Sequence, residues 1–344
     1  MNPNFLKKKN FHPRDKRIKF YEGPHLYTVD GEGGYTSVTT WNHSHFQDFN
    51  ADNIIANMMK SKNWPKSKYY GMTPVEIKKK WDCNRDEASS AGTKMHFDIE
   101  CFYNGLNVTN ESIEFEYFKQ FYNDYKHLIP YRTEWEVFHE ELKFSGSIDM
   151  SFVDENGHIE LCDWKRCKEI KKDNPWQSAK TECISHLPDT NFWHYTLQLN
   201  IYKAILESKY DKKVTKMYLV CLHPNNSNSS YLKYEVSDLS KEIKELFELR
   251  MTQLSKLEKE SNQVNQLINK LNDIKYNIND LLNQKDEILN KLSILDEKFE
   301  EDIEVDTKYH HETEYLVDNL SKYIYNENGE IIGLWLKNKP KLFK

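Results

Sequence analysis

A long stretch without helix-breaking residues constrains this chain most. Residues 225–328 contain neither Gly nor Pro, the two residues that most disfavour a helix interior. One apolar row recurs every seven positions and is broken only by Lys285: Leu257, Val264, Leu271, Ile278, Leu292 and Phe299. A second row follows the first by three positions: Leu267, Ile274, Leu281, Ile288 and Leu295. This period predicts a long amphipathic helix of coiled-coil character, or a helical hairpin that reverses in the Asn-rich residues 276–280.

The composition of the chain indicates a soluble protein with an unusually polar portion. It has 344 residues, of which 38% are hydrophobic and 30% charged, with a net charge of −6. Because the total charge is negative, any contact with nucleic acid must come from local basic patches. Six cysteines form no CxxC pair, which indicates reduced thiols in a soluble, intracellular protein. No apolar stretch is long enough to cross a bilayer, so we expect no membrane partner.

Local signals predict the order of the remaining elements. They indicate, in order, a hairpin within 18–41 that leads into a helix near Ser37, a helix over 73–82 with a capping box, a second helix that ends at Gly105, three strands within 131–166, a helix over 193–207, a strand over 216–223 and a hairpin at Asn328-Gly329. We therefore predict an α/β (α+β) fold in which helices flank a mixed sheet. The expected parts are a globular domain over 1–237, a coiled-coil segment over 238–305, and a C-terminal helix and β-hairpin over 306–344.

The segment GSIDMSFVDENGHIELCDWKR, residues 146–166, places three charged residues in a strand–turn–strand pattern. They are Asp149, Asp163 and Lys165, of types that strands disfavour. An ordinary explanation is the polar face of an exposed edge hairpin. The alternative is a metal site with a lysine beside it.

The metal interpretation requires one particular register of this hairpin. A two-residue turn at Asn156-Gly157 would pair 155 with 158 and send the two aspartates to opposite faces of the sheet. A three-residue loop over Glu155–Gly157, with Gly157 in the left-handed conformation, would instead pair 154 with 158 and therefore Asp149 with Asp163. The metal hypothesis thus predicts the three-residue loop.

In that register, two carboxylates converge as oxygen ligands for Mg²⁺ or Mn²⁺. Lys165 would stabilise negative charge on a phosphate or polarise a water molecule beside them. His96 and Glu100 lie one turn apart on a predicted helix and could add a nitrogen or an oxygen ligand. A metal that activates water and screens developing charge is what phosphodiester hydrolysis requires.

Five short motifs occur in an order that resembles a known family over residues 24–236. They are TSVTTW (36–41), AGTKMHFDIE (91–100) with His96 and Glu100, GSID (146–149), DWK (163–165), and QLNIY with Gln198 and Tyr202. Together they resemble the PD-(D/E)XK nucleases, in particular the RecB-like exonuclease branch that includes the mitochondrial genome maintenance exonuclease. Glu134 or Glu136 is similar to a strand glutamate of that branch.

The resemblance implies a restriction-endonuclease-like core and a Mg²⁺- or Mn²⁺-dependent deoxyribonuclease. It implies an exonuclease that acts on DNA ends or single strands in replication, repair or recombination. Asp149, Asp163, Lys165 and His96 would be catalytic, with Glu100 as a further ligand and with Gln198, Tyr202 and Glu134 in support. Some members hold an iron–sulfur cluster through three cysteines after the Q-x-x-x-Y helix. Only Cys221 follows Tyr202 here, so we expect no cluster.

A basic cluster follows the predicted catalytic strand, and we expect it to contact DNA: Arg166, Lys168, Lys171 and Lys172. The competing hypothesis is a nucleic-acid-binding or assembly protein on a nuclease fold, in which the coiled coil is the functional element. A coiled-coil scaffold with an incidental globular head would leave Asp149, Asp163 and Lys165 unexplained. In any of these cases the helical segment could associate with itself or with a protein partner.

Overall fold

The computed structural model describes residues 3–299 and 305–343. The chain divides into two compact units, Met1–Leu257 and Glu258–Lys344, which are described separately. The predicted boundary after residue 305 adjoins residues 300–304, which lie outside the described residues.

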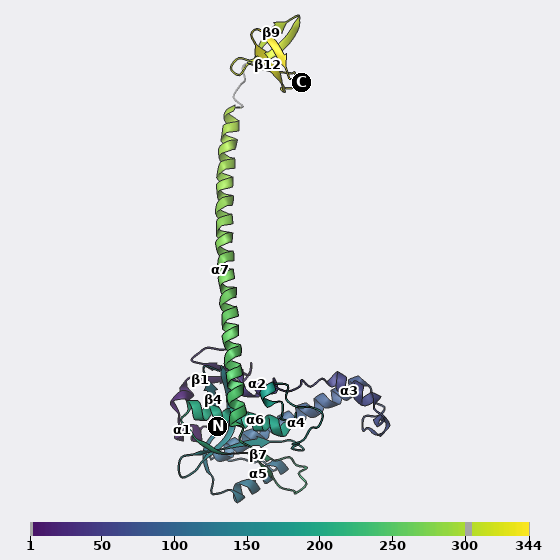
Figure 1. The fold of residues 1–344 in the computed structure, drawn as a ribbon, viewed down its shortest axis with the longest axis vertical. Coiled ribbons are helices and arrows are strands. Elements are labelled where there is room, and N and C mark those ends of the chain that lie inside the picture. The colour runs from purple at the N-terminus through teal and green to yellow at the C-terminus, as the bar shows by residue number, and fades with distance from the viewer. Residues whose placement is uncertain (1–2, 300–304, 344) are drawn as a thin grey trace. The chain divides into compact units, whose positions relative to one another are not determined.

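Within its described residues, the first unit contains a mixed six-stranded sheet (Figure 1). Its strands are β3 (Thr36–Ser37), β4 (Ile129–His139), β5 (Phe144–Val153), β6 (Ile159–Lys165), β7 (Val214–Cys221) and β8 (Leu232–Glu235). As predicted, β4, β5 and β6 form one antiparallel meander. β7 runs parallel to β6 and β3 runs parallel to the start of β5. The prediction of a mixed sheet flanked by helices is therefore confirmed.

The β5–β6 hairpin has the register that the metal hypothesis requires. Val153 pairs with Ile159 and Met150 with Cys162, and the Asp154 N–H donates to the His158 carbonyl at 2.9 Å. Gly157 has a φ of 80°, a conformation that glycine adopts without steric cost. The three-residue loop is thus confirmed, and the two-residue turn is absent.

Helices pack on both faces of this sheet. On one face, α4 (Pro74–Tyr103) and α5 (Ile113–Asp124) share a buried cluster with strand residues that include Met150 and Trp164. On the other, α6 (Asn191–Lys209) and α2 (Val38–His43) pack in a cluster that includes Leu161 and Leu219. α6 confirms the predicted helix over 193–207, and Ser37 caps α2 by accepting from the Thr40 N–H at 3.0 Å.

The two helices predicted within 73–105 are one continuous helix, α4. Its start has the expected capping box, since Thr73 Oγ1 accepts from the Glu76 N–H at 3.3 Å and Glu76 Oε2 accepts from the Thr73 N–H at 2.7 Å. Gly105, with a φ of 75°, follows its end as predicted. Residues 83–87 contain no Gly or Pro, so nothing in the backbone chemistry ends the helix there.

Several short elements complete the first unit. They are α1 (Phe5–Lys9), α3 (Ala51–Lys60), the two-stranded sheet of β1 (Ile18–Tyr21) and β2 (Leu26–Val29), and three 3₁₀ helices, η1 (Pro13–Lys16), η2 (Trp64–Lys66) and η3 (Glu182–Ile184). The β1–β2 hairpin confirms the hairpin predicted within 18–41.

The heptad stretch forms a single helix, α7 (Ser240–Phe299). The alternative of a reversal within 276–280 is therefore wrong. Ile243 and Leu246 are buried, but apolar residues of both heptad rows are exposed from Leu257 to Leu295; the side chain of Phe299 lies outside the described part. No helix within the described ranges is long and apolar enough to cross a membrane.

The second unit ends in a five-stranded antiparallel sheet. Its strands are β9 (Val305–His310), β10 (Thr313–Asp318), β11 (Tyr323–Tyr325), β12 (Ile331–Leu336) and β13 (Lys339–Leu342). The predicted hairpin at Asn328-Gly329 joins β11 and β12, and Val317, Ile324 and Trp335 form a small core. The predicted C-terminal helix is wrong, because strands occupy the described part of 306–344.

Candidate metal centre

Three carboxylates lie in one row across β4, β5 and β6. Thr133 pairs with Met150 and Trp135 with Ile148, which places Glu134 opposite Asp149. The β5–β6 ladder ends at the pair Met150–Cys162, and one further step in that register places Asp149 opposite Asp163. The two strands therefore separate at the aspartates.

Glu134 has an unusual backbone for a strand residue. Its φ is 41°, in the left-handed region that costs a non-glycine residue free energy. Its Oε2 accepts a hydrogen bond from Ser147 Oγ at 2.8 Å. Backbone strain of this kind concentrates at functional sites, and here it belongs to a carboxylate of the row.

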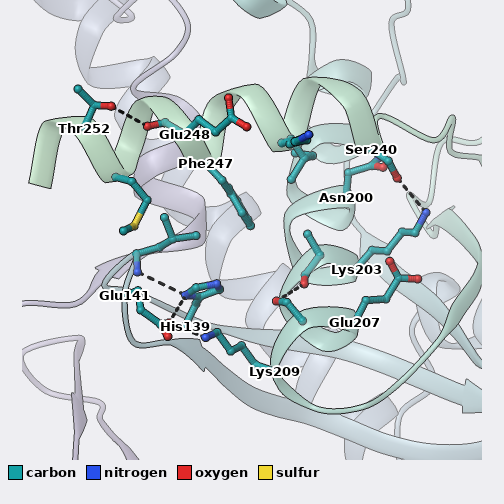
Figure 2. A pocket seen from close by; sticks show the side chains of 16 residues that line it. His139, Glu141, Asn200, Lys203, Glu207, Lys209, Ser240, Phe247, Glu248 and Thr252 are labelled. Carbon is teal, nitrogen blue, oxygen red and sulfur yellow. Dashed lines mark hydrogen bonds and ion pairs between the residues drawn. The ribbon is translucent and has the colours of Figure 1, made fainter.

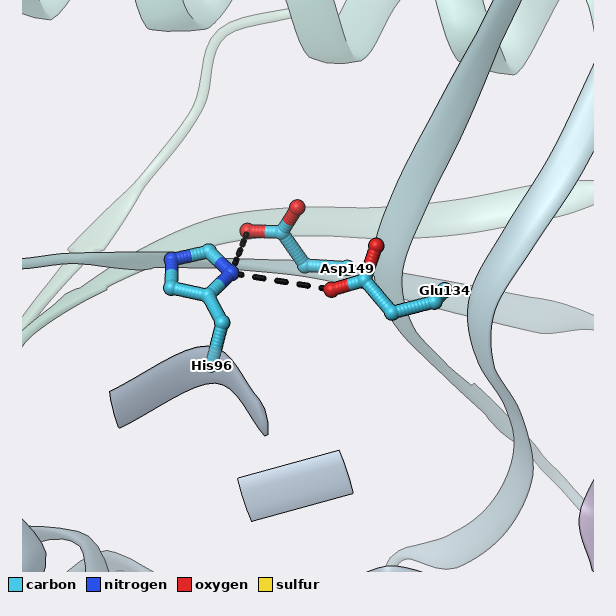
Figure 3. A group of neighbouring side chains, drawn as sticks. All are labelled: His96, Glu134 and Asp149. Carbon is cyan, nitrogen blue, oxygen red and sulfur yellow. Dashed lines mark ion pairs between the residues drawn. The ribbon is translucent and has the colours of Figure 1, made fainter. Parts of the chain in front are cut away.

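His96 of α4 reaches the row from the helix layer (Figure 3). Its Nδ1 lies 3.6 Å from Asp149 Oδ2 and 3.7 Å from Glu134 Oε1. Its Nε2 lies 3.0 Å from the Trp164 carbonyl oxygen, which can only accept a hydrogen bond. Nε2 must therefore carry a proton, so in the neutral ring the lone pair is on Nδ1 and points at the two carboxylates.

Trp164 ties this group to β6 through its backbone. Its N–H donates to Asp149 Oδ2 at 3.0 Å, and its carbonyl accepts from His96. The Trp164 side chain is buried among α4 and α5 residues, so packing fixes the peptide group that orients the side chains of His96 and Asp149. Such indirect support is typical of metal-ligating histidines.

One ligand atom from each of His96, Glu134 and Asp149 lies within 4.8 Å of the other two. Burial opposes a charge on His96, but Asp149 and Glu134 outweigh it and raise its pKa to about 9. In the metal-free protein a proton on Nδ1 thus supplies the positive charge that the carboxylates favour. One imidazole nitrogen and two carboxylates also suit a divalent cation.

Asp163 and Lys165 form an adjoining pair on β6. Lys165 Nζ lies 2.5 Å from Asp163 Oδ2, and Gln198 Nε2 donates to Asp163 Oδ1 at 3.3 Å. Asp163 is only 2% exposed, and its burial raises its pKa despite Lys165. Burial opposes the charge on Lys165, but Asp163 and Asp149 hold its pKa above the usual value. The ammonium therefore remains charged at neutral pH.

Asp163 lies beside the triad of His96, Glu134 and Asp149, not within it. Its Oδ2 is buried and pairs with the ammonium of Lys165. Two carboxylates and a histidine thus face one another, while the third carboxylate faces the lysine.

Tyr202 of α6 packs directly against Gly146 of β5. A Cβ atom on Gly146 would lie 2.6 Å from Tyr202 Oη and 2.9 Å from Tyr202 Cε1. Tyr202 is 2% exposed and lies one helical turn after Gln198. The absence of a side chain at Gly146 therefore lets α6 approach β5 closely enough for Gln198 to contact Asp163.

Glu100 does not belong to the triad. Burial and the nearby Glu134 raise its pKa to about 7, so it carries a proton for part of the time at neutral pH. The structure brings Glu134, which the sequence indicated only as a supporting residue, to the position expected for Glu100.

The predicted DNA-contacting residues differ in availability. Arg166 Nε donates to Glu114 Oε1 at 2.7 Å, and both side chains are largely buried, so Arg166 links β6 to α5 and is not free to contact DNA as predicted. Lys168 is exposed. Lys171 is exposed, and its Nζ lies 3.6 Å from Glu169 Oε2. The ammonium of Lys172 lies over the Phe192 ring.

The sequence reasoning missed Tyr195, whose ring lies 4.6 Å from Lys165 Nζ. A signal was present, since Tyr195, Gln198 and Tyr202 recur at the spacing of one helix face. It also missed Ser147 and the Trp164 peptide, and no sequence signal identifies them, because both act through non-local contacts.

A cavity of about 970 Å³ lies elsewhere in the first unit, between α6, the start of α7 and the turn after β4 (Figure 2). Leu142, Ile243, Phe247 and Met251 supply apolar surface, and lysines and glutamates also line the cavity. None of the triad residues lines it.

Comparisons with known proteins leave the family open. No family model and no curated protein matches the chain. A solved structure described as the crystal structure of SSO0001 aligns with 14% identity and a TM-score of 0.27, over 74% of this chain and 86% of that chain. A TM-score of this size does not establish a common fold.

Proposed function

We propose that the first unit is a PD-(D/E)XK-type nuclease that hydrolyses DNA phosphodiester bonds with Mg²⁺ or Mn²⁺. The observation that carries the proposal is the register of the β5–β6 hairpin. It places Asp149 and Asp163 at the point where the strands separate, although a commoner two-residue turn would have set them on opposite faces. We infer no iron–sulfur cluster.

The donor set fits the proposed cation. His96 Nδ1, Glu134 and Asp149 would hold it, with Asp163 adjoining them. Carboxylate oxygens suit Mg²⁺ and Mn²⁺, and an imidazole nitrogen favours Mn²⁺. The bound ion would act as a Lewis acid and would lower the pKa of a coordinated water molecule.

The remaining groups have roles that follow from their own contacts. Lys165 keeps its charge and can neutralise the charge that develops on a phosphate. Gln198 holds the Asp163 carboxylate through one hydrogen bond, and the Trp164 peptide orients Asp149 and His96. Lys168 and Lys171, exposed after β6, can contact the phosphate backbone.

The test is a cleavage assay on linear and circular DNA, both single- and double-stranded, and on RNA. We expect cleavage with Mg²⁺ or Mn²⁺, none with EDTA, and faster loss of linear than of circular single strands if the enzyme acts at ends. Asp149→Asn should abolish cleavage. Glu155→Gln, an exposed change in the loop of the same hairpin, is the matched control. Cleavage by Asp149→Asn at the parental rate would refute the proposal.

A second proposal concerns α7, whose two apolar rows are exposed from Leu257 to Leu295. We propose that they form a coiled-coil seam with another helix, either of a second copy or of a protein partner. Four heptads have apolar residues at both core positions: Val264 with Leu267, Leu271 with Ile274, Ile278 with Leu281 and Leu292 with Leu295. This pattern, interrupted once by Lys285, is typical of such seams. The exposed apolar rows therefore support a role in assembly in addition to catalysis.

A further inference from the structure

Residues 53–80, here called the arm, carry a charge opposite to that of the whole chain. The arm contains seven lysines and one glutamate, whereas the chain has a net charge of −6. All seven lysines are exposed: Lys60, Lys62, Lys66, Lys68, Lys78, Lys79 and Lys80. Among the described residues, Lys78 pairs with Asp52, and the other six form no ion pair with an acidic side chain.

The arm has its own small core and lies away from the sheet. Ile55 of α3, Tyr69 and Ile77 of α4 are buried together, with Trp64 and Trp81 packed against them. Figure 1 shows α3 and the loop that follows it at the end of α4 remote from the sheet. The arm lysines therefore surround a rigid support and not an unstructured tail.

Aromatic surface lies among these lysines. Tyr70 is 61% exposed, and its ring centroid is 5.9 Å from that of Trp64. A hollow of about 280 Å³ beside Trp64 is lined by hydroxyl, amide, ammonium and apolar groups: Met58, Ser61, Asn63, Trp64, Lys66 and Ser67.

Lysines that surround the exposed ring of Tyr70 and the partly exposed ring of Trp64 match the chemistry of a single nucleic-acid strand. Ammonium groups neutralise phosphates and release counterions, and an unstacked base can stack on an aromatic ring. Duplex DNA offers phosphates, but its bases are not free to stack. We propose that the arm binds single-stranded nucleic acid, with phosphates on Lys60, Lys62, Lys66 and Lys68 and a base against Tyr70 and Trp64.

This inference deepens the proposed nuclease function and rests on it for the identity of the ligand. α4 begins in the arm at Pro74 and carries His96 near its other end. At about 1.5 Å per residue, these two positions are about 33 Å apart along the helix axis. Only a strand long enough to span that distance can contact the arm and the metal centre together, so the arm would select longer strands.

The first experiment measures binding in EDTA, where no hydrolysis occurs. Fluorescence anisotropy with a labelled 30-nucleotide single strand compares the parent with K60Q/K62Q/K66Q/K68Q. The matched control is K241Q/K270Q/K275Q/K291Q, four exposed lysines of α7. Loss of four phosphate contacts should reduce the slope of log K against log salt concentration by about 2.8. Equal slopes and affinities for the arm variant and the control would overturn the inference.

Two further measurements separate a single strand from a general anion. Tyr70→Ala should weaken binding of the single strand by about five-fold or more through the lost stacking and leave duplex binding unchanged. The arm variant should also lower kcat/KM for a 30-nucleotide substrate but not for a four-nucleotide one. An unaltered single-strand affinity of Tyr70→Ala, or an equal effect on both substrate lengths, would contradict the inference.

The outcomes also separate this inference from the nuclease proposal. If the parent cleaves no nucleic acid but the arm variant loses binding in EDTA, the arm is a binding surface and the nuclease proposal fails. If the parent cleaves DNA and the arm variant binds as the control does, only the arm inference fails.

Discussion

Replacing Gly146 by alanine tests how closely α6 packs against β5 beside the candidate metal centre. In a strand, alanine ordinarily stabilises relative to glycine by about 0.5–1 kcal/mol because it restricts the unfolded chain. Here the new Cβ would lie 2.6 Å from Tyr202 Oη and 2.9 Å from Cε1. Tyr202 is buried and the contacts are with its rigid ring, so the structure predicts the opposite sign.

The magnitude follows from the two opposing effects. Overpacking a tight core site costs about 1–3 kcal/mol. Taking the middle of that range and subtracting the ordinary gain leaves a net loss of about 1 kcal/mol. At a urea slope of about 3 kcal/mol per M, the unfolding midpoint should fall by roughly 0.3 M. Tyr202→Phe removes the closest atom and leaves Cε1, so it should rescue Gly146→Ala in part.

The assay is urea unfolding followed by tryptophan fluorescence, with Gly92→Ala as the control. Gly92 is an interior residue of α4, and a Cβ added there would have no atom within 4 Å of it outside the helix's own backbone, so alanine should stabilise there by about 0.5–1 kcal/mol. If Gly146→Ala is as stable as the parent, the close contact between Gly146 and Tyr202 is wrong.

Three further perturbations test other parts of the structure. Although burial opposes the charge of His96, Asp149 and Glu134 raise its pKa to about 9 from 6.5, so it contributes stability that is complete below pH 6.5 and lost as pH rises through 9. Thermal unfolding in EDTA should therefore show a loss of folding free energy of up to about 3 kcal/mol between pH 6.5 and 9. His96→Gln should lack this loss, and a pH profile identical to that of the parent would contradict the prediction. Arg132 is almost fully buried, and its Nη1 lies 2.8 Å from Asp15 Oδ2. Asp15→Asn removes this counter-charge and should lower the free energy of chemical unfolding by about 3–5 kcal/mol; a loss below 1 kcal/mol would show that the pair is not buried. Leu271→Glu with Ile278→Glu should lower the mass measured by light scattering if the α7 seam self-associates, and Asn269→Glu with Asn283→Glu on other faces should not; an unchanged mass in the first variant would exclude self-association through these rows.

The sequence was most informative where local rules decide the structure. The heptad rows and the absence of Gly and Pro predicted α7, and the capping box at Thr73 and Glu76 predicted the start of α4. The parity of the strand register made the loop at Glu155–Gly157 a condition of the metal hypothesis, and the structure has that loop. These features depend on neighbours within a few positions.

The parts that sequence reasoning did not predict depend on distant contacts. Glu134 joins His96 and Asp149 because β4 pairs with β5 and because its φ is positive; no local signal distinguishes it from Glu100. Arg166 is held by Glu114, which is 52 positions away. The C-terminal strands were missed because short segments without strong periodicity are ambiguous between helix and strand.

The rate of DNA cleavage by Asp163→Asn tests the central claim most directly. Asn keeps the size of the side chain, and Asp149 still stabilises the charge on Lys165, so the variant should fold and should retain much of its DNA binding. We predict that, in single-turnover assays with Mg²⁺ or Mn²⁺, the parent and Glu155→Gln cleave a labelled strand and Asp163→Asn does not. Cleavage by Asp163→Asn at the parental rate, or no metal-dependent cleavage by the parent, would contradict the account.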